Sequence, residues 1–87
     1  MIKIWAKVMD KNKIVKQTTF FDNAEKMDYS LFFEYLTKIC HTLDIPTPII
    51  LKTHIFNYAK FNFVRFTKDD FVESISFDSL WLENGDR

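Results

Sequence analysis

The fold is decided above all by residues 28–43, which read DYSLFFEYLTKICHTL. Asp28 is a residue type that caps helices, and the residues after it have the apolar spacing of an amphipathic helix. At about 100° per residue, one broad arc is apolar: Leu31, Phe32, Tyr35, Leu36, Ile39, Cys40 and Leu43. The opposite side is polar: Glu34, Thr37, Lys38 and His41. We predict a helix over residues 29–43 with Leu36 and Ile39 in the core and His41 exposed.

Before this helix, the N-terminal residues predict a β-hairpin. From residue 2 to residue 8 the even positions are apolar and Lys3 and Lys7 stand at odd positions, which is the alternation of a half-buried strand. Turn-forming Asp10 and Asn12 follow, and β-branched residues resume at residues 14–21. The turn type stays open because the turn contains no glycine.

The middle of the chain allows two interpretations. Pro46 and Pro48 bias the residues before them away from helical geometry, so the first helix ends near them. We favour a short buried strand at residues 49–51 and a short helix near residues 53–60. In the alternative, Thr47 and Pro48 begin a helix that runs to about residue 61.

The last third of the chain predicts one further strand. Residues 61–66 fit a strand or irregular backbone, and residues 67–70 fit a turn or a single helical turn. Residues 74–82 predict a terminal strand, after which residues 83–87 are expected to fray. The expected fold is therefore a two-layer α+β domain, in which the helix of residues 29–43 covers one face of a small antiparallel or mixed sheet.

Size and composition indicate one domain, residues 1–87. A chain of 87 residues can build one hydrophobic core, and its 47% hydrophobic content argues against intrinsic disorder. No stretch approaches the roughly 18 uncharged residues of a membrane span, and the first residues lack an apolar run of signal-peptide length. The single Cys40 fits a reducing compartment. We expect a cytoplasmic protein without a membrane partner.

The two ends of the chain carry opposite charge although the net charge is zero. Residues 1–20 hold five lysines against Asp10, a net +4, and residues 69–87 hold six acidic residues against Arg87, a net −5. A basic end can attract nucleic acid. We favour the simpler interpretation that the first and last segments lie side by side and balance each other.

Common catalytic and cofactor signatures are missing from the sequence. Gly85 is the only glycine, and phosphate-binding loops need glycines so that backbone amides can approach the phosphates. Cys40 and His41 point about 100° apart on the predicted helix, so one metal ion can hardly bind both, and we interpret them as a buried thiol beside a solvated imidazole. We predict no cofactor, no metal site and no catalytic residue among the common designs.

His54 is the one weak candidate for a functional side chain. It follows a predicted strand end, where functional groups often occur, and Asp69 or Asp70 would have to reach it for it to act as a base. We favour a structural role in which His54 caps a helix or bonds to backbone.

Several segments together resemble a family of small uncharacterised proteins from low-GC anaerobic, clostridial-type bacteria. They are LDIPTPIIL at residues 43–51, Lys52 and His54, DFVE at residues 70–73, and Phe77-Asp78. With the strand at residues 1–8, the resemblance covers almost the whole chain. It implies a bacterial source and no specific activity, since the family has none assigned.

The aromatic content points to binding. Ten Phe, three Tyr and two Trp exceed what so small a core readily hides. Trp5 lies opposite the aliphatic face of its strand, and Phe33 lies outside the buried arc of its helix, so we predict that one or both contact a protein partner or a second copy. Lys3 and Lys7 beside Trp5 also suit base stacking, although we favour packing there. We therefore expect a non-catalytic protein-interaction module first, a nucleic-acid-binding regulator second, and an enzyme using His54 third.

Overall fold

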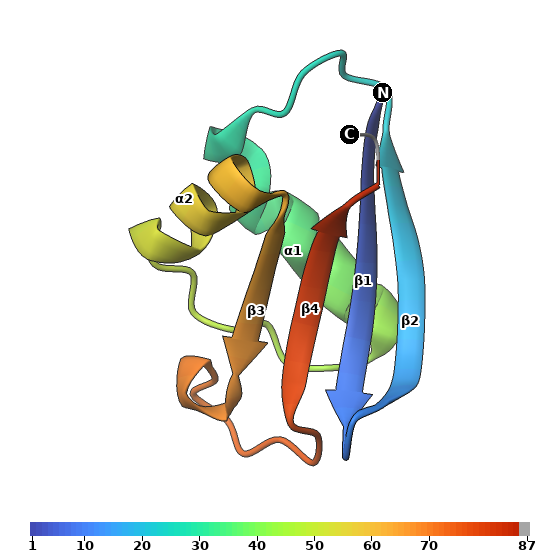
Figure 1. Cartoon of the computed structure of the whole chain (residues 1–87), viewed down its shortest axis with the longest axis vertical. Coiled ribbons are helices and arrows are strands. Elements are labelled where there is room, and N and C mark those ends of the chain that lie inside the picture. Colours follow the sequence, from blue (N-terminus) through green and yellow to red (C-terminus); the bar gives the residue numbers. More distant parts are fainter. Residues whose placement is uncertain (86–87) are drawn as a thin grey trace.

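Residues 1–85 are described by the computed structural model and form a four-stranded antiparallel sheet with two α-helices packed on it (Figure 1). The strands are β1 (Ile2–Asp10), β2 (Lys13–Asp22), β3 (Phe63–Thr67) and β4 (Ser79–Asn84), in the spatial order β2-β1-β4-β3. The helices are α1 (Phe32–Leu43) and α2 (Lys52–Phe61), and two short 3-10 turns are η1 (Tyr29–Leu31) and η2 (Lys68–Asp70). The predicted α+β fold is confirmed.

The core lies between the sheet and the two helices. Alternate residues of three strands are buried in it: Ile2, Ile4, Ala6 and Val8 from β1, Val64 and Phe66 from β3, and Leu80 and Leu82 from β4. We call this the inner face of the sheet, and the opposite side the outer face. The ring of Tyr58 on α2 packs 5.2 Å from that of Phe32 on α1, so both helices contribute to one core. Among the described residues, the Tyr58 hydroxyl is buried without a hydrogen-bond partner.

Helix α1 follows the predicted pattern closely. Asp28 accepts a hydrogen bond from the Ser30 backbone N–H at 3.0 Å and so caps the η1 turn that leads into the helix. The predicted arc is buried except for Leu31, which is 37% exposed. Leu31 differs because it belongs to η1, where the 3-10 geometry turns residues differently from an α-helix.

The hairpin closes through a two-residue turn. Lys11 and Asn12 both have positive φ, 52° and 63°, which is the geometry of a type I′ turn without the usual glycine. Asp78 holds this turn, because its carboxylate accepts the Lys11 backbone N–H at 2.9 Å and its own N–H bonds the Met9 carbonyl.

Strand β4 pairs with β1, which confirms that the two ends of the chain lie side by side. Lys7 and Glu83 form an ion pair of 2.7 Å across this pairing. The predicted fraying of residues 83–87 is wrong for residues 83 and 84, because β1 reaches back to Ile2 and supplies them with partners. Residues 86 and 87 lie outside the described residues.

The predicted strand at residues 49–51 is missing, and the predicted terminal strand has different bounds. Residues 49–51 are not a strand, and the Ile49 backbone N–H bonds the Asp70 carbonyl at 2.7 Å instead of a sheet neighbour. The following helix is present and begins at Lys52. The terminal strand begins at Ser79 and not at residue 74, because Ser79 pairs with Met9 and β1 ends one residue later.

Candidate functional site

An open apolar groove lies between the start of α1 and the segment that leads into α2. Its volume is about 650 Å³, and its lining comprises Tyr29, Ser30, Phe33, Thr47, Pro48, Ile49, Ile50 and Ile55. Phe33 is 59% exposed and Ile49 is 50% exposed. None of the lining residues in the described part of the chain carries a charge. We refer to this feature as the apolar groove.

Local structure explains why these apolar side chains remain at the surface. Asp28 bonds both the backbone N–H and the hydroxyl of Ser30, which orients η1 and with it Tyr29; these hydrogen bonds also hold the pKa of Asp28 below its usual value. On the other wall, Pro48 is fully buried, and the Ile49 N–H donates to the Asp70 carbonyl, which ties the segment to η2. Hydrogen bonds and burial therefore hold both walls of the groove in place.

His54 positions the start of α2. Its Nδ1 accepts the Leu51 backbone N–H at 2.9 Å, while Nε2 lies 3.4 Å from a carboxylate oxygen of Asp70. The other Asp70 oxygen accepts the Thr67 N–H at 2.8 Å, and the His54 ring packs 4.5 Å from the ring of Phe66. The predicted helix-capping role of His54 is confirmed. Because both ring nitrogens already face partners, this geometry leaves neither of them directed at a substrate.

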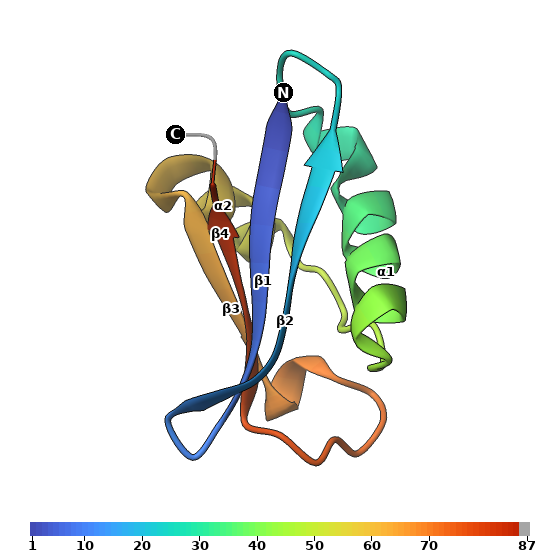
Figure 2. The ribbon, with the colours of Figure 1, turned by 90° about the vertical axis from the view of Figure 1, so that its right-hand side faces the viewer.

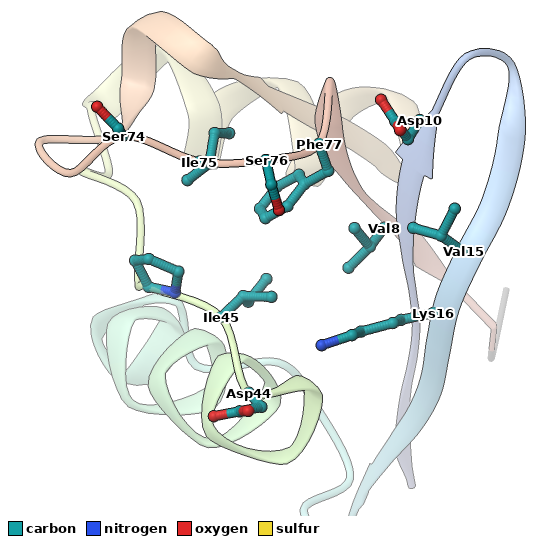
Figure 3. A pocket seen from close by; sticks show the side chains of 11 residues that line it. Val8, Asp10, Val15, Lys16, Asp44, Ile45, Ser74, Ile75, Ser76 and Phe77 are labelled. Atoms are coloured by element: carbon teal, nitrogen blue, oxygen red, sulfur yellow. The ribbon is translucent and has the colours of Figure 1, made fainter.

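A second hollow, of about 350 Å³, lies where the hairpin, the end of α1 and residues 74–77 meet (Figure 3). Lys16 reaches across it and donates to the Leu43 carbonyl at 3.0 Å. A lysine at a helix C-terminus is favoured by the helix dipole, so this ammonium group stabilises α1. Asp10 and Asp44 also line the hollow, and their negative charges oppose the binding of an anion there.

Aromatic and basic side chains on the outer face of the sheet pack against one another. Lys7 lies between Trp5 and Trp81, with its ammonium nitrogen 4.1 Å and 5.4 Å from the two ring centroids, and is only 8% exposed. Phe63 meets Trp81 edge to face at 5.4 Å. The Trp5 indole N–H donates to Gln17 at 3.0 Å. These contacts favour the packing interpretation of Trp5, which nevertheless remains 37% exposed.

Cys40 and His41 are arranged as predicted, with the thiol buried and the imidazole exposed. No group of three or more potential metal-ligating side chains occurs within residues 1–85. Burial raises the pKa of the Cys40 thiol from 9.0 to about 11. The thiol is therefore protonated and unreactive at neutral pH.

This pKa predicts slow alkylation of Cys40 in the native protein. A rise from 9.0 to about 11 lowers the thiolate fraction at pH 8 by about a hundredfold, and burial limits access further. Iodoacetamide at pH 8 should label the protein in urea and leave the native protein unlabelled, as judged by mass spectrometry. Because the folded-state pKa is the higher one, the contribution of the neutral thiol to stability is complete below pH 9 and is lost as the pH rises through 11. Labelling of the native protein at the rate of a free cysteine would contradict the burial of Cys40 and the raised pKa of its thiol.

The sequence predicted only part of the apolar groove and of the aromatic contacts on the outer face of the sheet. Sequence reasoning selected Trp5 and Phe33, which lie on opposite sides of the molecule, on the outer face of β1 and on α1. It missed Tyr29 and Ile49 as neighbours of Phe33, since no local pattern brings residues 29, 33 and 49 together. Phe63 and Trp81 carried a usable signal, because each alternates with core residues in its strand.

Comparison with known proteins yields no match to a family model, to a curated protein or to a solved structure. The resemblance to the clostridial-type family therefore stays a prediction. Within the described residues, no helix is long and apolar enough to cross a membrane.

Proposed function

We propose that the protein is a non-catalytic protein-interaction module whose apolar groove receives an apolar segment of a partner protein. The observation that carries this proposal is the position of Phe33, which is 59% exposed and stands in a groove with uncharged lining. Large apolar side chains gathered in one place at the surface are typical of interaction sites, and Phe is a residue type that interface centres favour.

The size and chemistry of the groove suit a short amphipathic helix or an extended apolar peptide. A volume of about 650 Å³ lies within the range of ligand-binding clefts. Tyr29, Ser30 and Thr47 add hydroxyl groups to the otherwise apolar lining. An apolar helix face inserted into such a groove would bury Phe33 and Ile49, which provides the free energy of binding.

The same chemistry disfavours nucleic acid as the ligand of the groove. Affinity for nucleic acid comes mainly from cations that neutralise phosphates, and none of the described residues that line the groove is cationic. On the outer face, Lys7 is already paired with Glu83 and enclosed by two indole rings, so it does not project toward a phosphate. Salt-dependent binding of a fluorescent oligonucleotide of mixed sequence would favour the nucleic-acid alternative.

A peptide-display selection tests the proposal. A random peptide library selected on the immobilised protein should converge on sequences with apolar residues at helical spacing, and calorimetry should confirm their binding in solution. Phe33→Ser should weaken these peptides by about thirtyfold, as expected for a central interface aromatic. Its melting temperature should change little, because Phe33 is largely exposed.

Phe56→Ser is the matched control. Phe56 is also 59% exposed and lies on α2, but it does not line the groove. This variant should bind the selected peptides like the parent protein. Equal loss of binding in the two variants, or convergent peptides that ignore Phe33→Ser, would reject the groove as the site.

A further inference from the structure

Strand β2 leaves one edge of the sheet open. The spatial order β2-β1-β4-β3 makes β2 an edge strand. It has ten residues, whereas β3 at the other edge has five. In Figure 2 the molecule is seen from this side, and no helix or loop formed by residues 1–85 lies across β2. Backbone N–H and C=O groups along such an edge can pair with another strand.

The regular part of this edge is Lys16–Asp22. The pairing with β1 shifts between Val8 and Met9, which leaves Val15 as an unpaired bulge residue in β2, whereas residues 16–22 pair one to one with β1. The five residues between Lys16 and Asp22 are uncharged and read QTTFF. Phe21 is 55% exposed. The segment has the composition of a strand that joins another sheet.

We propose that β2 pairs antiparallel with β2 of a second copy of this chain, with Thr19 opposite Thr19 at a two-fold axis. This register aligns the regular segments of both copies in full. It places Lys16 of each copy opposite Asp22 of the other, and it brings Gln17 opposite Phe21 and Thr18 opposite Phe20. The result is a continuous sheet of eight strands. No residue of β2 lines the apolar groove, so the inference is independent of the proposed function.

Charge complementarity favours a second copy over an unrelated strand. The segment begins with a cation and ends with an anion, so only antiparallel self-pairing makes both of its ends complementary at once. A two-fold axis perpendicular to the sheet requires paired residues on the same face. Lys16 and Asp22 meet this condition, because their partners Val8 and Ile2 both belong to the inner face. Such an interface is closed, so assembly stops at two copies.

Disulfide trapping tests the register. Cα atoms of directly paired residues lie about 4.5–5.5 Å apart, within the range that a disulfide spans. Thr19→Cys should therefore oxidise to a covalent dimer under mild oxidation, and Cys40 does not compete because it is buried. Gln17→Cys is the control, since it is also exposed but would lie about 13 Å from its counterpart. Equal cross-linking of the two variants would overturn the register.

A charge exchange tests the pairing independently. Lys16→Glu alone and Asp22→Lys alone each place like charges opposite one another, and each should weaken dimerisation by about tenfold in sedimentation equilibrium. In an equimolar mixture of the two variants, the introduced Glu lies opposite the introduced Lys, and the native Lys16 lies opposite the native Asp22. The mixture should therefore dimerise as strongly as the parent protein. Melting temperatures verify that both variants fold, since Lys16 also bonds Leu43 and Asp22 accepts from Tyr35. A parent protein that sediments as a monomer at millimolar concentration, or a mixture no stronger than either variant, would overturn the proposal.

Discussion

Leu36→Ala should lower the free energy of unfolding by about 2–5 kcal/mol. Leu36 has no exposed surface and lies at the centre of the buried face of α1, so truncation removes apolar contacts and leaves a cavity. Urea denaturation followed by circular dichroism measures the change, which should be a lower midpoint with an unchanged slope.

His41→Ala is the matched control on the same helix. His41 is exposed on the opposite side of α1, so its removal should change the free energy of unfolding by less than about 0.5 kcal/mol. Similar losses from Leu36→Ala and His41→Ala would contradict the assignment of the two faces of the helix.

Phe66→Ala should destabilise the protein by about 3–5 kcal/mol. Phe66 has no exposed surface, pairs with Leu80 across β3 and β4, and packs its ring against His54. The substitution therefore opens a cavity and also removes the support of the residue that caps α2. Thermal and urea unfolding both measure the loss.

Arg65→Ala provides the comparison one residue earlier in β3. Arg65 is exposed on the outer face, so its replacement should be nearly neutral. If Phe66→Ala leaves too little folded protein to measure, Phe66→Leu gives a smaller loss of about 1.5 kcal/mol. Equal effects at positions 65 and 66 would mean that β3 does not alternate between core and solvent.

The sequence by itself determined the elements whose residues bury one face through a local repeat. Helix α1 was predictable because six apolar residues at helical spacing follow a capping Asp28. Strand β1 was predictable because its alternation has period two, and the opposite charges of the chain ends indicated that β1 and β4 are neighbours. These features need no knowledge of distant residues.

Only the tertiary structure decided the features that depend on distant partners. Residues 49–51 have the composition of a strand, but the Ile49 N–H bonds Asp70 and the preceding Pro48 is buried, so Ile49 and Ile50 line the groove instead. The ring of His54, which caps α2 through Leu51, also contacts Asp70 and Phe66, which lie 16 and 12 residues further along the chain. Strand β4 begins where β1 ends, at the pairing of Ser79 with Met9, and not where its own apolar pattern begins. The assembled fold sets hydrogen-bond partners and burial, because a segment forms a strand only where another strand pairs with it, and a side chain is buried only where other residues pack over it.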